Sequence, residues 1–142
     1  MLVEHNDEKV SAATLHALTA AAKVGGEVSV LAVGKGIDSV VAEAGKLAGV
    51  TRVLYANCDA SGFLAEAISP IIAGSQKQFN FTHIFAAATA TGKNVLPRVA
   101  AKLDVELISD IQGVEGEDTF TRAIYAGSNN NNNKKKRKKK KR

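Results

Sequence analysis

The chain has 142 residues, 45% of them apolar and 5% aromatic, and a formal net charge of +5. Nine of its nineteen Lys and Arg residues lie at 134–142, so residues 1–133 hold ten against fourteen Asp and Glu and carry −4. The length favours one domain, and the low aromatic content argues against a base-stacking platform. Cys58 is the only cysteine, which excludes an internal disulfide, and the apolar runs are shorter than the roughly 20 residues that a bilayer span needs.

The first half of the chain alternates short apolar runs with stretches of helical periodicity. Ser11 can cap a helix that carries Leu15, Leu18 and Ala22 on one face, and glycines tolerate the left-handed turn that ends it. The run "EVSVLAV" is β-branched and apolar, as in a strand covered on both faces. The predicted order is a strand at Leu2–Val3, a helix from Ser11 to Gly25-Gly26, a strand at Glu27–Val33, a helix with apolar positions from Ile37 to Ala48 that ends at Gly49, and a strand at Arg52–Asn57.

The second half continues this alternation and then changes period. A helical stretch follows Cys58, and we predict a break in it with Ser69 as cap and Pro70 at the first position of a new helix, because proline lacks an N–H. The two β-like runs near the end, separated by "EGED", predict a hairpin. The remaining predictions are a buried strand at His83–Ala88, a loop at Thr89–Lys93, a helix with apolar positions from Val95 to Leu103, and the hairpin strands within 108–114 and 119–126.

This order predicts an α/β fold: a mainly parallel sheet sandwiched by helices in a nucleotide-binding-like layer fold, a C-terminal β-hairpin and a disordered basic tail. Parallel sheets of this kind place ligand loops at the carboxyl ends of their strands. The loops to inspect are therefore Val33–Gly36, Asn57–Gly62 and Thr89–Gly92.

Two glycine loops resemble phosphate-binding motifs in part. Gly34-Lys35-Gly36 resembles the start of a dinucleotide fingerprint, but Ser39 stands where the third glycine belongs. Gly92-Lys93-Asn94 resembles the end of a P-loop, but Ala87 and Asn94 replace its first glycine and its magnesium-binding Ser or Thr. We interpret both as ordinary turns.

The remaining polar residues predict no catalytic, cofactor-binding or metal residue. The three histidines lie on separate elements without metal-ligand spacing, so we expect His5 and His16 to be exposed and His83 to start a strand. Cys58 ends a strand and has the pattern of a small buried cysteine. The other candidates are Asp110 beside Ser109, which has no base partner, and a cluster typical of a solvated turn, Glu115, Glu117 and Asp118.

Whole segments resemble the N-terminal domain of the electron transfer flavoprotein alpha subunit. They are "TLHALTAAAKVGGEVSVLAVG", "AEAGKLAGVTRVLYA", "GKNVLPRVAAKLDVELISDI" and "DTFTRAIYAG". The likeness covers residues 2 to 127 in the family's order. It implies two parts, a domain at 1–127 and a low-complexity Asn/Lys tail at 128–142.

The resemblance implies a heterodimer of alpha and beta subunits that carries electrons through one FAD. It takes them from acyl-CoA and related dehydrogenases, in fatty-acid beta-oxidation, and passes them to a membrane quinone oxidoreductase. It implies a location in the mitochondrial matrix, or in the cytoplasm if the chain is bacterial or has no targeting segment. The opening stretch "MLVEHNDEKV" shows no transit peptide.

The family's division of labour makes this part a scaffold that packs with the beta subunit. In the family, FAD lies chiefly in the alpha C-terminal domain, and here the tail stands in place of that domain. No cofactor residue is therefore carried over. We expect that this chain alone holds no FAD. The family's further strands after "IYAG" are also replaced, and the opening strand is short. We expect the missing strands to leave a bare sheet edge and the short opening strand to pair weakly.

The tail, Ser128 to Arg142, has two interpretations. Nine adjacent basic residues would bind nucleic acid without sequence choice and with steep salt dependence. Alternatively, codons beginning with A can encode every tail residue, which is typical of a translated adenine-rich stretch and is the interpretation we favour. For the body, an adenine-nucleotide-binding domain is a third hypothesis, which the defective glycine loops weaken.

Overall fold

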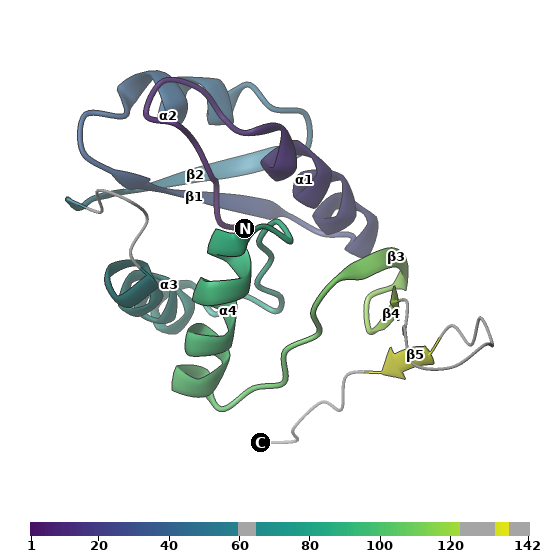
Figure 1. Cartoon of the computed structure of the whole chain (residues 1–142). Helices are drawn as coiled ribbons and strands as arrows, with labels where there is room; N and C mark the ends of the chain where they lie inside the picture. Colours follow the sequence, from purple (N-terminus) through teal and green to yellow (C-terminus); the bar gives the residue numbers. More distant parts are fainter. Residues whose placement is uncertain (60–64, 123–132, 137–142) are drawn as a thin grey trace.

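The computed structural model describes residues 1–59, 65–122 and 133–136. Within those residues it has four helices and five strands, and the strands form two sheets. Two strands pair in parallel, and three others form an antiparallel sheet. In chain order the elements are α1 (Ala12–Val24), β1 (Val28–Gly34), α2 (Asp38–Gly45), β2 (Val50–Asn57), α3 (Ala65–Phe79), α4 (Ala90–Leu103), β3 (Ile111–Gly116), β4 (Thr119–Arg122) and β5 (Asn133–Lys136) (Figure 1).

The α/β layering is confirmed around β1. Figure 1 shows α1 and α2 on one side of β1 and β2, and α3 and α4 on the other. Alternate β1 residues enter two cores: Val30 and Ala32 pack with α1 and α2, whereas Leu31 and Val33 pack with α3 and α4. This burial on both faces explains why the strand is continuously apolar.

The parallel sheet is smaller than predicted, because two expected strands are not formed as ladders. Leu2 makes only an isolated parallel bridge to Leu31, and its N–H donates to Phe85 O at 2.8 Å. The first apolar run is followed at once by the polar "HNDEK" loop, which leaves two residues for pairing. The predicted buried strand His83–Ala88 is wrong as well: it is not a strand, and only Ala87 in it is buried.

The helices differ from the prediction mainly at their ends. Ser11 caps α1 as predicted, accepting a hydrogen bond from Thr14 N–H, and the helix stops before Gly25 at φ +90°. The second helix ends at Gly45, earlier than the predicted Gly49. The fourth begins at Ala90 with Thr89 as its cap, so most of the predicted Thr89–Lys93 loop is helical.

The predicted break at Pro70 is wrong, because α3 runs through it. Ser69 is fully buried, and its hydroxyl donates to Ala65 O at 2.5 Å, within the helix. On the same face Ala65, Ile68 and Ile72 are buried in the core shared with α4. Apolar burial along this face therefore outweighs the hydrogen bond that proline cannot make.

The predicted C-terminal hairpin is confirmed as the antiparallel pair β3 and β4. β5, which lies within the segment predicted to be disordered, pairs antiparallel with the other side of β4. An unpaired strand edge offers free N–H and C=O groups to such a segment. The predicted β-run over 123–126 and the rest of the tail lie outside the described residues.

None of the described helices is long and apolar enough to cross a membrane.

The α-amino group of Met1 gives the fold a pH dependence. It donates to Ser29 O at 2.7 Å beside β1, and burial lowers the pKa of this group from 8.0 to about 6. Between these pH values the unfolded chain binds more protons than the folded chain, so stability should rise with pH from 6 to 8. The rise is expected to reach roughly 2 kcal/mol.

Denaturant unfolding below pH 6 and above pH 8 measures this rise. The matched control is the same chain acetylated at Met1, which keeps an N–H donor but has no titrating amine. The acetylated chain should lose this part of the pH slope. Equal slopes in the two chains would contradict the assignment to Met1.

Candidate functional site

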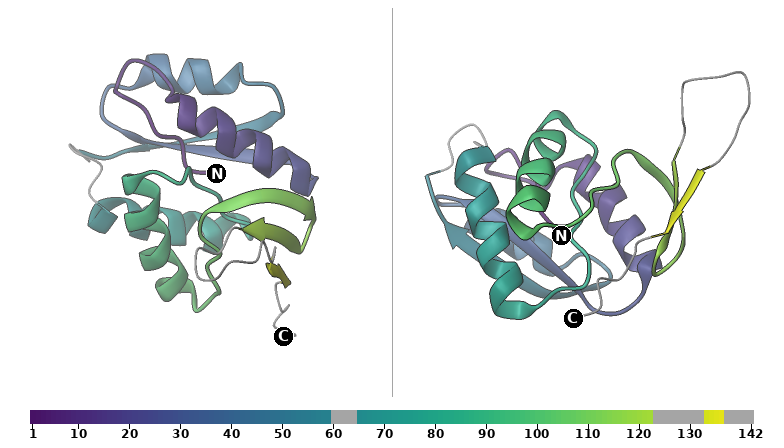
Figure 2. Two further views of the ribbon diagram at one scale, coloured as in Figure 1. Left: turned by 45° about the vertical axis from the view of Figure 1, so that its right-hand side comes forward. Right: turned by 90° about the horizontal axis from the view of Figure 1, so that it is seen from below.

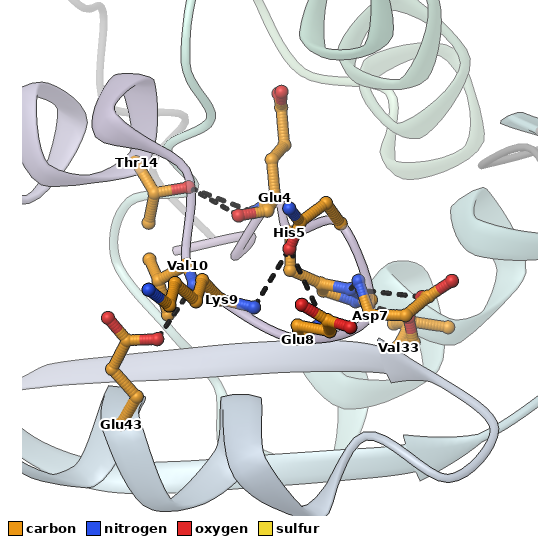
Figure 3. A network of polar contacts seen from close by, with 10 residues as sticks. Glu4, His5, Asp7, Glu8, Lys9, Val10, Thr14, Val33 and Glu43 are labelled. Atoms are coloured by element: carbon orange, nitrogen blue, oxygen red, sulfur yellow. Dashed lines mark hydrogen bonds and ion pairs between the residues drawn. The ribbon is translucent and has the colours of Figure 1, made fainter.

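The segment 4–10 begins at the carboxyl end of β1, where His5 lies beside Val33 and a ligand loop was expected, and it reaches Glu43 of α2 at Val10 (Figure 3). His5, predicted to be exposed, is only 8% exposed. Its Nε2 lies 3.0 Å from Val33 O, and its Nδ1 lies 3.1 Å from Asp7 N. Nε2 can donate to Val33 O, and Nδ1 also lies 3.3 Å from Asp7 Oδ1. The imidazole therefore closes the end of β1, and the expectation was wrong because sequence spacing does not show tertiary partners.

The Gly34-Lys35-Gly36 loop is packed by the protein's own side chains. A Cβ added at Gly34 would lie 3.0 Å from Ile37 Cγ2 and 3.3 Å from His5 Cε1. Gly36 has φ +68°, a conformation that few other residues adopt. The glycines therefore serve a turn and a close packing contact, in line with the tight turn predicted for this loop.

The amino-terminal end of α4 is tied to the opening segment. Thr89 Oγ1 accepts from Gly92 N–H at 3.1 Å and donates to Glu4 Oε1 at 2.6 Å. Lys93, which a phosphate site would use, is paired with Asp110 at 2.8 Å instead. The helix terminus is thus capped internally and linked to residues that precede α1.

Valine at Thr89 should lower the free energy of unfolding by about 1–2 kcal/mol, because it removes both the cap and the bond to Glu4. Serine at the same position keeps the hydroxyl and is the matched control. Denaturant unfolding of the two variants is the measurement. A valine variant as stable as the serine variant would show that these two bonds contribute nothing.

Three of the other polar candidates, His16, His83 and Asp110, line one cavity, whereas Cys58, Glu115, Glu117 and Asp118 lie outside its lining. His16 is exposed, and His83 places Nε2 2.8 Å from Glu117 O in the hairpin. Cys58 is half-buried against the core of α3 and α4. Glu115 accepts from Thr121 Oγ1 at 2.9 Å. Within the part of the chain that the structure describes, no three His, Cys, Asp or Glu residues gather as a metal would require.

An apolar groove is the feature that the sequence did not predict. A cavity of about 750 Å³ lies between α1, residues 83–89, α4 and residues 105–111. Small side chains of α1, Ala13, Ala17 and Ala20, line one wall, and Leu96 and Ala100 of α4 line another. The spacing of these alanines is the one signal in the sequence. Most of the lining is apolar and suits apolar contact, and the titratable side chains of His16, His83 and Asp110 lie at the same cavity.

Comparison with known proteins gives one consistent family. The family described as "Electron transfer flavoprotein domain" matches residues 1–138. The chain belongs to this electron transfer flavoprotein family.

Individual relatives of this family are alpha subunits. The chain is 48% identical over 129 residues to the probable electron transfer flavoprotein subunit alpha, mitochondrial, of Caenorhabditis elegans. The aligned region covers 90% of this chain and 39% of the relative. It is 45% identical over 129 residues to electron transfer flavoprotein subunit alpha of Pseudomonas aeruginosa, with 90% and 41% covered. For the Dictyostelium discoideum mitochondrial alpha subunit the identity is 40% over 135 residues, with 90% and 38% covered. The chain spans about two fifths of these relatives.

At two of the three expected loops, the described residues of this flavoprotein-family chain do not fit a flavin dinucleotide, and residues 60–62 of the third loop, Asn57–Gly62, lie outside the described residues. A pyrophosphate needs open backbone N–H groups near glycines at a helix terminus. Here His5 and Ile37 fill the space over Gly34, and the hydroxyl of Thr89 takes the Gly92 N–H. The expectation that this chain alone holds no FAD remains a proposal, which these contacts support.

Proposed function

We propose that this chain is the N-terminal supporting part of an electron transfer flavoprotein alpha subunit and that it packs with a beta subunit. The carrying observation is the match of 90% of this chain to about two fifths of each alpha subunit. The proposed domain is 1–127, and the tail at 128–142 is a separate low-complexity segment. In this proposal the chain is an electron-carrier subunit part without a catalytic site.

The whole protein, under this proposal, receives electrons from acyl-CoA and other dehydrogenases and passes them through FAD to a membrane quinone oxidoreductase. Three relatives from Caenorhabditis, Dictyostelium and Cryptococcus are named as mitochondrial, which supports the mitochondrial matrix as the location. The relative from Pseudomonas supports the cytoplasm if the chain is bacterial.

Flavin content tests the supporting role directly. The purified chain, incubated with excess FAD and desalted, should show no stoichiometric flavin absorbance, because its glycine loops are closed by its own side chains. Tight binding of one FAD per chain would overturn the proposal that another part of the protein carries the cofactor. The same assay with ATP or AMP decides the adenine-nucleotide alternative.

The nine basic residues at 134–142 support a second candidate function, which is non-specific binding of nucleic acid. Each neutralised phosphate releases counterions, so affinity should fall steeply as salt rises. Replacing the nine basic residues at 134–142 with glutamine should abolish binding to random-sequence DNA. Equal DNA binding by the unchanged and substituted chains would exclude the tail as the binding element.

A further inference from the structure

The side of β4 that faces away from β3, which we call the β4 edge, is formed by the backbone of Thr119–Arg122. Four residues of β5 pair with it in antiparallel register, from Thr119 opposite Lys136 to Arg122 opposite Asn133. Figures 1 and 2 show β5 alongside this edge. An edge of this kind presents N–H and C=O groups that another strand can bind.

The segment bound at the β4 edge has an unusual composition for a strand. Asn133–Lys136 contains no apolar residue, so its pairing cannot depend on burying apolar side chains. Backbone hydrogen bonds and charge attraction remain. Residues 1–133 carry −4 against nine basic residues at 134–142. In the β3–β4 hairpin Glu115 and Glu117 are exposed, and Arg122 is the single basic residue of Ile111–Arg122.

We propose that the β4 edge is a strand-addition site for extended lysine-rich peptides, which the chain fills with its own residues 133–136. Backbone bonding gives such a site affinity for any extended segment, and the acidic surroundings select basic ones. The inference does not depend on the proposed electron-transfer role. It treats the tail as a ligand held in cis.

The cis arrangement explains when a separate peptide can bind. Residues 123–132 connect β4 to β5, and a link of about ten residues holds a segment at an effective concentration on the order of millimolar. A peptide added in trans would therefore compete poorly until the cis pairing is broken. Breaking it without removing the tail is the basis of the test.

The test uses the full chain with Lys134→Pro and Lys135→Pro together. Successive residues of a strand direct their N–H groups to opposite sides, so one of any adjacent pair faces β4 and proline removes that donor. The matched control is Lys134→Gln with Lys135→Gln, which loses the same two charges but keeps both N–H groups. The probe is a fluorescent peptide with the sequence of residues 133–142.

At low salt the proline variant should bind this peptide about tenfold more tightly than the glutamine variant, because only the proline variant has a free β4 edge. A second pair of peptides carries the same two prolines or the same two glutamines. The proline peptide should bind the proline variant about tenfold more weakly than the glutamine peptide. Equal binding of the two peptides would mean that charge alone attracts them and would overturn strand addition.

Amide exchange of the unsubstituted chain keeps the proposal falsifiable if the proline variant unfolds. The amides of 119–122 that do not bond to β3 should be protected at low salt and should lose protection at high salt, while β1 amides stay protected. Absence of protection at low salt would overturn the proposal. Glu115→Gln with Glu117→Gln should reduce the same protection, and an unchanged protection would contradict the role of charge.

Discussion

Alanine at Gly92 is expected to lower the free energy of unfolding by about 3 kcal/mol or more. The reason is the close approach of α4 to the end of the preceding segment. A Cβ at Gly92 would lie 1.9 Å from Ala87 O, which is a backbone atom and cannot rotate away. The amino-terminal turn of α4 would have to move, and the bond from Gly92 N–H to Thr89 Oγ1 would be strained with it.

The matched control is alanine at Gly74, an exposed helical glycine with nothing within 4 Å of its Cβ position. This change should stabilise α3 by about 0.5–1 kcal/mol, because alanine favours helix more than glycine does. Thermal and denaturant unfolding of both variants measure the difference. Equal stability of the two variants would contradict the close packing of α4 on Ala87.

Alanine at Ile68 should cost about 2–5 kcal/mol of unfolding free energy. Ile68 is 0% exposed and lies in the core that β1 shares with α3 and α4. Truncation removes apolar contacts and leaves a cavity that helices fixed on both sides can close only in part. The size of the effect reports how tightly α3 packs despite Pro70.

Leu15→Ala is the control for Ile68→Ala, since Leu15 on α1 is 43% exposed. Its cost should stay below about 1 kcal/mol. Denaturant midpoints of the two variants, at equal slopes, give the comparison. A larger loss at Leu15 than at Ile68 would show that the core between β1, α3 and α4 is not the main source of stability.

Sequence patterns predicted those parts of the fold that local signals determine. Ser11 and Gly25 bound α1 because capping and left-handed turns act within a few residues. The continuous apolar run of β1 predicted that this strand is buried on both faces. The break at Pro70 failed because tertiary burial of Ile68 and Ile72 outweighs a local preference. The predicted strand at His83–Ala88 failed because strand formation depends on a neighbour that the local sequence does not specify.

Local sequence predicted the turn at Gly34-Lys35-Gly36, whereas the contacts that distant residues make around the candidate site were not predicted. Ser39 in place of a glycine already indicated that the Gly34 loop is an ordinary turn. The burial of His5 depends on Val33, 28 residues away, and the bond from Thr89 to Glu4 spans 85 residues. No spacing rule reports such contacts. The groove beside α1 is likewise a product of packing.

Association with a beta subunit is the most direct test of the proposed role. The chain, first shown to be folded by circular dichroism, would be mixed with the purified electron transfer flavoprotein beta subunit of its own organism and examined by sedimentation velocity. The proposal predicts a complex with one copy of each chain, without stoichiometric flavin in the unmixed chain. A folded chain that sediments independently of the beta subunit at all concentrations would contradict it.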